Sequence, residues 1–339
     1  MTVLDKELNL TVSSSPHIRF LEDTKSIMLD VIIALLPALA VATYMFGIRA
    51  LILTAVTCAA CVFFEWGYRK LLKKTNDIGD LSAVVTGILL ACCLPVSTPL
   101  WIAVTGAFFS IIIVKQLFGG IGKNFMNPAL AGRAFLFSWP VVMSTWVSPL
   151  SYDSFFTLNM ADAVTTATPM GSLHVASLPE NLTLMQSFFG QVGGSMGEIS
   201  AFALIVGGLY LLARRVITPI IPLSFLLSVA VVTYVFPRGN DNLQWMLWNL
   251  LSGGLMLGAI FMATDYSTSP VTIKGQIIFG VGCGLLTVFI RYFGAYPESV
   301  SYSILIMNAC VWLIDKVSFP KRFGEKSGGI KKAKEADAK

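Results

Sequence analysis

Charged side chains are scarce in this sequence, at 13% of its 339 residues, about half the share found in an ordinary soluble domain. Histidine is rarer still. His17 and His174 are the only two, and no nucleophile is arranged around either, which argues against a histidine-activated nucleophile. Hydrophobic residues make up 55% of the chain, and its mean hydropathy is +0.74. This composition excludes a typical soluble domain and predicts a protein whose solvent is lipid.

Long apolar segments recur along the chain, each close to the ~20 residues that a helix needs to cross a bilayer. The strict alternation of apolar and polar positions that marks the strands of a membrane barrel is missing. The sequence therefore predicts an all-α polytopic membrane protein with about ten transmembrane helices. The segments lie near residues 27–47, 50–67, 82–97, 100–117, 128–145, 200–213, 217–236, 245–263, 275–293 and 299–315.

The six cysteines do not form a metal framework. All six cysteines fall within apolar segments. Cys58 and Cys61 have the C-x-x-C spacing of redox and metal sites, but no second pair lies near them in the sequence. Their place in the middle of an apolar segment favours buried, small hydrophobic side chains.

Basic residues are shared unevenly between alternate loops, which sets the expected orientation. No small-residue cleavage site follows the first apolar segment, so we expect the N-terminus to stay in the cytoplasm. Loops on that side then hold most lysines and arginines, and the outer loops hold only Arg49, Arg238 and Arg291. The net charge of +5 thus reflects membrane topology rather than nucleic-acid binding. We expect a cytoplasmic segment at 1–26, helices one to five at 27–146, an extracytoplasmic loop at 147–199, helices six to ten at 200–316 and a basic cytoplasmic tail at 317–339.

The two halves of the chain share a weak but ordered correspondence. Pro95–Pro99 resembles Asp265–Pro270, and Phe118–Gly120 resembles Phe293–Ala295. About five helices separate the copies, and an odd number of spans places the second copy upside down in the membrane. Two inverted five-helix repeats and a chance recurrence of short Ser, Thr and Pro runs both stay open.

The expected outer loop contains the stretch DAVTTATP at Asp162–Pro169, which is rich in hydroxyl groups and has no bulky side chain. Thr, Asp and Pro favour turns, so a solvated turn is one interpretation. The other interpretation is that an accessible threonine hydroxyl is esterified to a phosphate. Small neighbours would then let an enzyme or a large cofactor approach the backbone.

This stretch resembles the flavinylation motif shared by B subunits of sodium-pumping NADH:quinone reductases and D subunits of Rnf complexes. The resemblance implies that Thr168 carries FMN through a phosphoester bond. It also implies that a flavin transferase attaches the FMN, with Asp162, Thr165 and Ala167 in its recognition sequence. The outward orientation expected for the loop agrees with this chemistry.

Phe118–Arg133 is similar to a second signature of the same family, with F-M where the family has P-F. Asn124 and Asn127 offer amide donors and acceptors, and the resemblance makes them candidate contacts of a second flavin, a noncovalent riboflavin. Asn127 before Pro128 is equally typical of a helix cap. Arg133 lies inside an apolar span, where an unpaired charge costs at least ~2.5 kcal/mol. It is therefore expected to face a partner, a cavity, the second flavin or a phosphate, or to snorkel toward the membrane surface.

Met262–Thr272 resembles a third segment of the family, and Ile290–Glu298 is similar to the stretch before the last helix of Rnf D subunits. Asp265 ends an apolar segment, where it could steer cations, fix a partner loop or simply be solvated. Three motifs in order, over about Ile27–Pro320, favour the D component of an Rnf complex. The reductase B component is less favoured because its longer N-terminal extension is missing.

The resemblance implies a subunit of a bacterial inner-membrane complex that passes electrons between ferredoxin and NAD while moving Na⁺ or H⁺. Such a subunit is not a complete enzyme, and its covalent FMN would relay electrons. Its implied partners are the A, B, C, E and G components of the Rnf complex, the flavin transferase and the lipid bilayer. No NAD site is expected in this chain, because Gly119–Gly122 lacks the strand, helix and acidic partner of a dinucleotide fingerprint.

Two other classes fit the same apolar pattern. A secondary transporter or channel would also use inverted repeats and polar Ser, Thr and Asn side chains between helices. A scaffold subunit without its own cofactor would need only the helices. Both alternatives predict a colourless protein, whereas the flavin interpretation predicts a yellow one. The sequence leaves the coupling ion and the direction of electron flow open.

Overall fold

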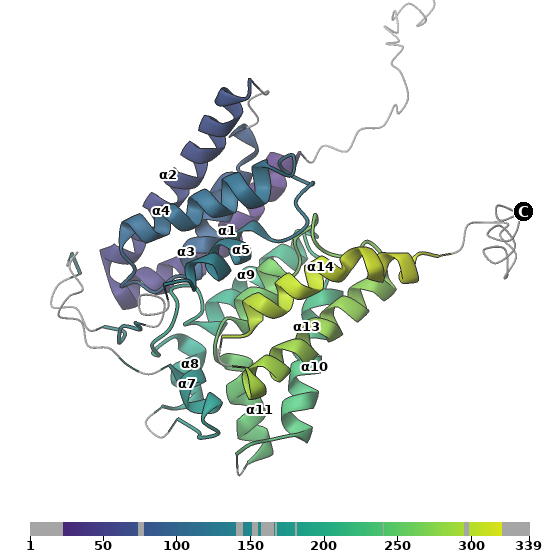
Figure 1. Ribbon diagram of the computed structural model, residues 1–339. Helices are drawn as coiled ribbons and strands as arrows, with labels where there is room; N and C mark the ends of the chain where they lie inside the picture. The colour runs from purple at the N-terminus through teal and green to yellow at the C-terminus, as the bar shows by residue number, and fades with distance from the viewer. Residues whose placement is uncertain are drawn as a thin grey trace, which may run out of the picture.

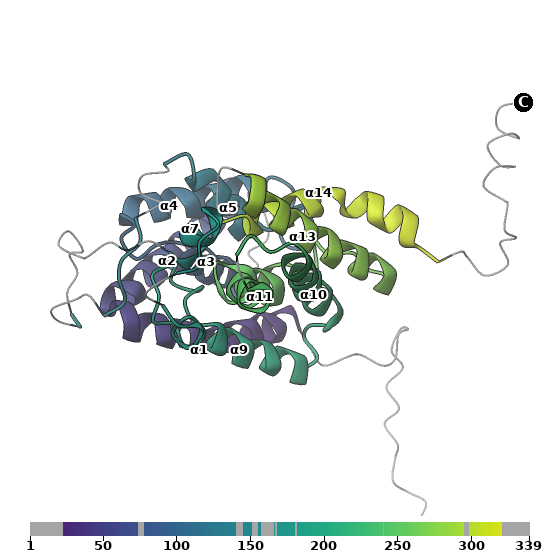
Figure 2. The same ribbon diagram turned by 90° about the horizontal axis from the view of Figure 1, so that it is seen from below.

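The computed structural model describes residues 23–73, 78–139, 145–150, 155–156, 166, 168–179, 182–239, 241–294 and 298–320. Over these residues the regular structure is helical, which confirms the all-α prediction. Two groups of helices stand side by side, one from each half of the chain, and the short helices α7 and α8 lie at one end of them (Figure 1). The view from below shows α1 and α9 next to each other along the seam between the groups (Figure 2).

The first group begins with two long helices joined at Gly47, whose φ of 75° suits glycine. A π-helix, in which the backbone bonds skip one residue further than in an α-helix, continues α4. The elements are α1 (Thr24–Phe46), α2 (Ile48–Leu71), the 3-10 turn η1 (Ile78–Asp80), α3 (Ser82–Cys92), α4 (Leu100–Phe108), the π-helix η2 (Phe109–Gln116) and α5 (Pro128–Leu136).

The short helices α7 and α8 belong to the connection between the halves, and the second group begins after them. Among the described residues this group contains a second π-helix, η3, which ends a broken helix. The elements are α7 (Pro169–His174), α8 (Leu184–Phe189), α9 (Ala201–Ala213), α10 (Ile220–Val235), α11 (Asn242–Leu251), α12 (Leu255–Leu257), η3 (Gly258–Met262), α13 (Ile273–Phe293) and α14 (Val300–Ser318).

Not every apolar segment forms one long helix. Among the described residues four helices are long and apolar enough to span a membrane, or five if one bent pair is counted as a span. The four are α1, α2, α13 and α14, and shorter apolar helices of 10–17 residues lie among them. The chain is thus a multi-pass membrane protein in which several expected spans are broken or short.

Two of these helix breaks have identifiable causes. Helix α3 has 11 residues and rises only about 16 Å, half of the hydrocarbon thickness. Its last carbonyls are met by a loop: the N–H of Met196 donates to Leu94 O and the N–H of Gly197 donates to Cys92 O. Helix α11 ends at Leu251, and the chain bends by 63° before α12. Irregular backbone of this kind is tolerated in a membrane protein only where protein surrounds it.

The packing order within each half is the same. In the first half α2 packs against α3 and α4, and in the second α10 packs against α11 and α13. The two pairs of similar segments fall at matching places in the fold. The first pair, Pro95–Pro99 and Asp265–Pro270, follows α3 and η3. The second pair begins at the ends of η2 and α13. This agreement supports a structural repeat over chance recurrence.

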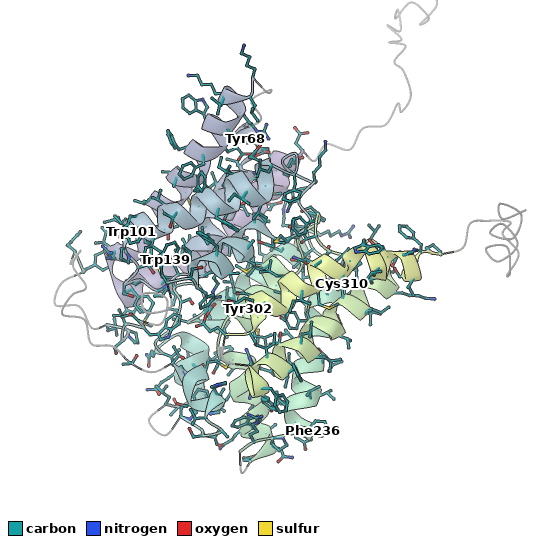
Figure 3. The ribbon with its side chains drawn as sticks, viewed as in Figure 1. Tyr68, Trp101, Trp139, Phe236, Tyr302 and Cys310 are labelled. Carbon is teal, nitrogen blue, oxygen red and sulfur yellow. The ribbon has the colours of Figure 1, made fainter. Side chains whose placement is uncertain are left out.

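Some aromatic side chains lie toward helix ends, as in the interfacial belts of membrane proteins (Figure 3). Figure 3 shows Tyr68 at the far end of α2 and, on the opposite side of the first helix group, Trp101 beside Trp139. The rings of Trp101 and Trp139 meet edge to face, with their centroids 6.2 Å apart. Many other large apolar side chains on the helix surfaces are exposed, which suits contact with lipid or with other membrane proteins.

Candidate functional site

Thr168 begins helix α7. Its Oγ1 accepts a hydrogen bond from the N–H of Gly171 at 3.2 Å, so the side chain serves as the N-cap. Only 9% of Thr168 is exposed. Four buried apolar side chains pack together to anchor α7 on α11: Met170, Leu173, Trp245 and Trp248. The other predicted motif residues, Asp162, Thr165 and Ala167, lie outside the described residues.

A small pocket adjoins Thr168. Its wall includes three glycines, Gly193, Gly194 and Gly253, which add backbone rather than side-chain groups to the lining. Ser252 also lines this pocket. The side chain of Ser252 is buried, and its Oγ has no hydrogen-bond partner within the described chain. A buried hydroxyl without a partner is costly, so this wall suits a ligand that carries hydrogen-bond acceptors. The pocket is lined by Thr168, Pro169, Met170, Ser187, Val192, Gly193, Gly194, Glu198, Ile199, Leu251, Ser252, Gly253 and Glu298.

Two carboxylates of this pocket share one arginine. Arg133 of α5 donates from Nη1 to Glu198 at 2.7 Å and from Nη2 to Glu298. Ser195 also accepts from Nη2, at 3.4 Å. All three charged groups are largely buried. The prediction that Arg133 needs a partner is thereby confirmed. Sequence reasoning missed both glutamates, because each lies in a loop more than 60 positions away from Arg133.

Arg291 closes the broken end of α11. Its guanidinium donates to the backbone carbonyls of Asn249 and Ser252 at 2.6 and 3.2 Å. These carbonyls lie at the C-terminus of α11, where the helix leaves its last acceptors without internal partners. A cation is also favoured there by the helix dipole. The sequence predicted an outer-loop position for Arg291, which is wrong: Arg291 is buried in the last turn of α13 and has a structural role beside the Thr168 pocket.

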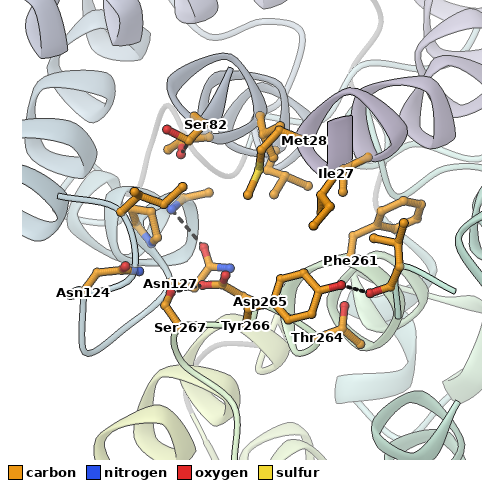
Figure 4. Close-up of a pocket in the computed structure, with 18 of the residues that line it drawn as sticks. Ile27, Met28, Ser82, Asn124, Asn127, Phe261, Thr264, Asp265, Tyr266 and Ser267 are labelled. Carbon is orange, nitrogen blue, oxygen red and sulfur yellow. Dashed lines mark hydrogen bonds between the residues drawn. The ribbon is translucent and has the colours of Figure 1, made fainter. Parts of the chain in front are cut away.

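A second, larger pocket lies between the two helix groups. Figure 4 shows Asn124, Asn127 and Asp265 gathered on one side of it, with Ser82 and Met28 across from them. The hydroxyl of Tyr266 donates to Val216 O at its edge (Figure 4). Apolar side chains make up much of the remaining wall: Ile27, Val31, Val85, Leu89, Leu211, Ile217 and Phe261.

Asn127 acts as a helix cap. Its Oδ1 accepts from the N–H groups of Ala129 and Leu130, and Nδ2 donates to Met262 O at 3.2 Å. Pro128 occupies the first position of α5, where its missing N–H costs nothing. The predicted cap is confirmed. Asn127 also lines the central pocket, so ligand contact through its second N–H stays a prediction.

Asn124 and Arg133, the other predicted contacts of a second flavin, lie in different places. Asn124 lines the central pocket, and its Nδ2 donates to Met126 O at 3.1 Å. Arg133 is not among the lining residues of that pocket and belongs to the ion cluster near Thr168. Asp265 lines the central pocket and accepts hydrogen bonds from the hydroxyls of Ser267 and Thr268.

The two pockets lie at opposite ends of α9. Ile199, just before α9, lines the Thr168 pocket, and Leu211, near the end of α9, lines the central pocket. A helix of 13 residues is about 20 Å long. The bundle therefore holds two separate polar sites, one toward each end.

Cys58 and Cys61 both lie in α2. Both are free thiols, and Cys61 is fully buried. No group of three or more potential metal ligands occurs among the described residues. The burial of Cys61 agrees with the interpretation of a small hydrophobic side chain, and Cys58 is partly buried.

Broken helices around two pockets that carry polar groups, in a chain of apolar helices, define a polytopic membrane protein. The chain belongs to the NQR2, RnfD, RnfE family, whose profile matches residues 11–324. This confirms the family resemblance that the motifs indicated.

Three relatives, each the D component of its complex, span almost the whole chain. The chain is 52% identical to that of a Na⁺-translocating ferredoxin:NAD⁺ oxidoreductase complex from Acetobacterium woodii, over 94% of this chain and 96% of the relative. It is 43% identical to that of a proton-translocating ferredoxin:NAD⁺ oxidoreductase complex from Clostridium ljungdahlii, over 93% and 96%. It is 40% identical to that of an ion-translocating oxidoreductase complex from Stutzerimonas stutzeri, over 89% and 93%.

Proposed function

We propose that this chain is the membrane-embedded D component of an Rnf-type complex, which couples electron transfer between ferredoxin and NAD to the movement of Na⁺ or H⁺. The relatives named for this activity are similar over nearly their full length, which supports the assignment. The chain contributes to an oxidoreductase and is not a complete enzyme alone. Its proposed partners are the A, B, C, E and G components of the complex.

The first proposed cofactor is FMN, joined to Thr168 by a phosphoester bond that a flavin transferase makes. One observation carries this assignment: the last threonine of the motif begins α7 at the wall of a polar pocket. Ser252 Oγ, which has no hydrogen-bond partner among the described residues, is the group that would donate to a phosphate oxygen there. FMN supplies one-electron chemistry, and the protein supplies its position and electrostatic surroundings.

The second proposed cofactor is riboflavin, bound without a covalent bond in the central pocket. A flavin needs apolar walls for its ring faces and polar groups for its ring edge. The pocket offers both, with Leu89 and Phe261 among the apolar residues and Asn124, Asn127 and Asp265 among the polar ones. A site at each end of α9 would let the chain pass electrons along the helix bundle.

The proposed location is the bacterial inner membrane, with both termini in the cytoplasm and the Thr168 loop outside. Figure 1 shows the start of α1 and the end of α14 on the side away from α7 and α8. Basic residues follow that side: Arg69 and Lys70 end α2, Arg214 follows α9 and Lys316 ends α14. This distribution supports the proposed orientation through the positive-inside rule.

A secondary transporter without flavin is the second candidate, because broken helices around a central pocket also suit the binding of a transported solute. The two candidates differ in colour. A transporter would purify without flavin absorbance, whereas the proposed flavoprotein would be yellow.

The test is to express the chain in membranes with an active flavin transferase, denature it on a gel and look for flavin fluorescence. Thr168→Val is compared with Thr166→Val, a matched loss of a nearby threonine hydroxyl in the same motif. We expect fluorescence from the wild type and from Thr166→Val, and none from Thr168→Val. A dark wild type beside an active transferase would reject the flavin assignment and favour the transporter.

A further inference from the structure

Lys115 brings a positive charge to the wall of the central pocket. It lies on the π-helix η2, and its side chain is 3% exposed. The extra residue in a π-turn shifts side chains out of the regular helical order, and such turns occur often at functional sites. Lys115 and Asp265 are the two charged residues among those that line the pocket. The cofactors proposed above do not by themselves give Lys115 a task.

The contacts of Lys115 hold its ammonium group in one place. Nζ lies 3.0 Å from Glu65 Oε1, donates to Glu65 Oε2 at 3.1 Å and donates to Ser82 Oγ at 2.6 Å. Ser82 lines the same pocket, whereas Glu65 is fully buried and does not. The charge therefore faces the pocket on one side and its counter-ion on the other.

Glu65 has other partners besides Lys115. Gln116 donates to its Oε1 at 2.6 Å, and Arg69 lies 3.5 Å from the same oxygen. Asp80 is the remaining nearby acid, and its Oδ1 accepts from the hydroxyl of Ser82. A carboxylate with this many donors does not require Lys115 for its own stability. A lysine kept at the pocket wall at the cost of burying its charge suggests a task toward the pocket.

We infer that Lys115 is a redox-tuning residue that stabilises negative charge on a flavin in the central pocket and so raises its midpoint potential. The inference rests on the proposed second flavin. Lys115 keeps its proton throughout, and no bond forms or breaks at it. The electron arrives from a redox carrier of the complex and leaves to another, while the ammonium offsets the added charge in a site of low dielectric constant.

Glu65 sets the strength of this effect. Its carboxylate attracts the same ammonium and partly cancels the field of Lys115 in the pocket. Removing Lys115 should therefore lower the potential of the bound flavin, and neutralising Glu65 should raise it. A merely structural ion pair would not give shifts of opposite sign, because losing either partner would only loosen the pocket.

The experiment is a redox titration of the full chain in the Thr168→Val background, where noncovalent flavin is the remaining chromophore, monitored by absorbance. We expect Lys115→Met to reduce the ratio of reduced to oxidised flavin at a fixed potential about tenfold, a shift of about 59 mV for one electron. Glu65→Gln should shift the potential the opposite way, and Lys115→Arg should restore it toward the wild-type value. Lys123→Met, an exposed lysine outside the pocket lining, is the control and should change nothing.

Two outcomes would overturn the inference, and they are distinguishable. If the parent chain retains flavin but Lys115→Met and Glu65→Gln shift its potential the same way or not at all, Lys115 has only a structural role. If the parent chain holds no noncovalent flavin, the second cofactor of the proposed function fails together with this inference. Covalent flavin on Thr168 would be untouched by either result.

Discussion

Glu298 experiences two opposing effects. Burial raises the pKa of its carboxyl, and the guanidinium of Arg133 lowers it. Arg133 divides its donors between Glu198 and Glu298, so one positive charge cannot compensate both carboxylates. Burial therefore prevails, and the pKa of Glu298 lies above its ordinary value. The residue lies before α14, outside the helical spans, next to the proposed flavin site.

This shift predicts how stability depends on pH. The folded chain holds the proton of Glu298 more tightly than the unfolded chain, so stability is lost as the pH rises above the ordinary glutamate pKa of ~4.3. We expect thermal unfolding in detergent to show a loss on the order of 1 kcal/mol between about pH 5 and about pH 8 that Glu298→Gln removes. Asp23→Asn, at an exposed acid, is the control. An unchanged pH profile in Glu298→Gln would contradict the assignment.

Residues near the sites differ in how far the sequence could predict them. The cap at Asn127 follows from the dipeptide with Pro128, which is a local signal. The need of Arg133 for a partner follows from its apolar surroundings. Its partners Glu198 and Glu298 could not be identified, because no local rule connects α5 to two distant loops. The pairing of Lys115 with Glu65, 50 positions apart, could not be predicted for the same reason.

Among the helices, α1 and α9 pack closely at a glycine. A Cβ built on Gly207 would lie 2.1 Å from the backbone oxygen of Ala34 and 3.0 Å from Phe261 Cζ. Small residues at such crossings let membrane helices approach closely. The neighbouring Gly208 faces Ile260 in a similar way. This contact joins the two helix groups and forms part of the frame of the central pocket.

Gly207→Ala should therefore destabilise the fold, although alanine is the better helix former. The added methyl group meets a backbone atom that cannot rotate away, and overpacking of this kind costs about 1–3 kcal/mol. Gly67→Ala in α2 is the matched control, because nothing lies within 4 Å of its built Cβ. Thermal unfolding in detergent should show a lower Tm for Gly207→Ala and an unchanged or higher one for Gly67→Ala. Equal Tm values would mean that the helices can separate without cost.

Hydropathy was enough to predict that the elements are helices, but it did not predict where the helices break. Apolar runs of suitable length identify helices because a membrane leaves few other structures possible. The end of α3 at Cys92 depends on the loop around Met196, which supplies hydrogen bonds from about 100 positions away. The bend after Leu251 depends on Arg291, which binds the freed carbonyls. Hydrogen-bond partners that are distant in the sequence produce no periodic hydropathy pattern.

At the scale of the whole molecule, the two pockets are assembled from many segments. The central pocket takes residues from α1, α3, η2, α5, α9 and η3. Motifs indicated Asn124, Asn127 and Asp265 separately, and the fold brings them to one pocket (Figure 4). The apolar wall and Lys115 were not predicted, since apolar residues of a pocket and of a lipid-facing surface look alike in sequence.

The proposed orientation predicts which side each site faces. Ser177, beyond α7, and Lys73, beyond α2, are exposed and lie at opposite ends of the bundle. We expect a membrane-impermeant maleimide to label Ser177→Cys in intact cells, and Lys73→Cys only after the membrane is opened. The parent chain without an added cysteine gives the background from its native thiols. Labelling in the reverse pattern would invert the topology.

The central claim is that Thr168 carries a covalent flavin, and peptide mass spectrometry tests it most directly. The chain is purified from membranes that contain an active flavin transferase, and the peptide spanning Thr168 is fragmented. We predict an added mass of FMN less one water, located on Thr168 and absent from Thr168→Val. An unmodified Thr168 peptide, or FMN located on another residue, would contradict it.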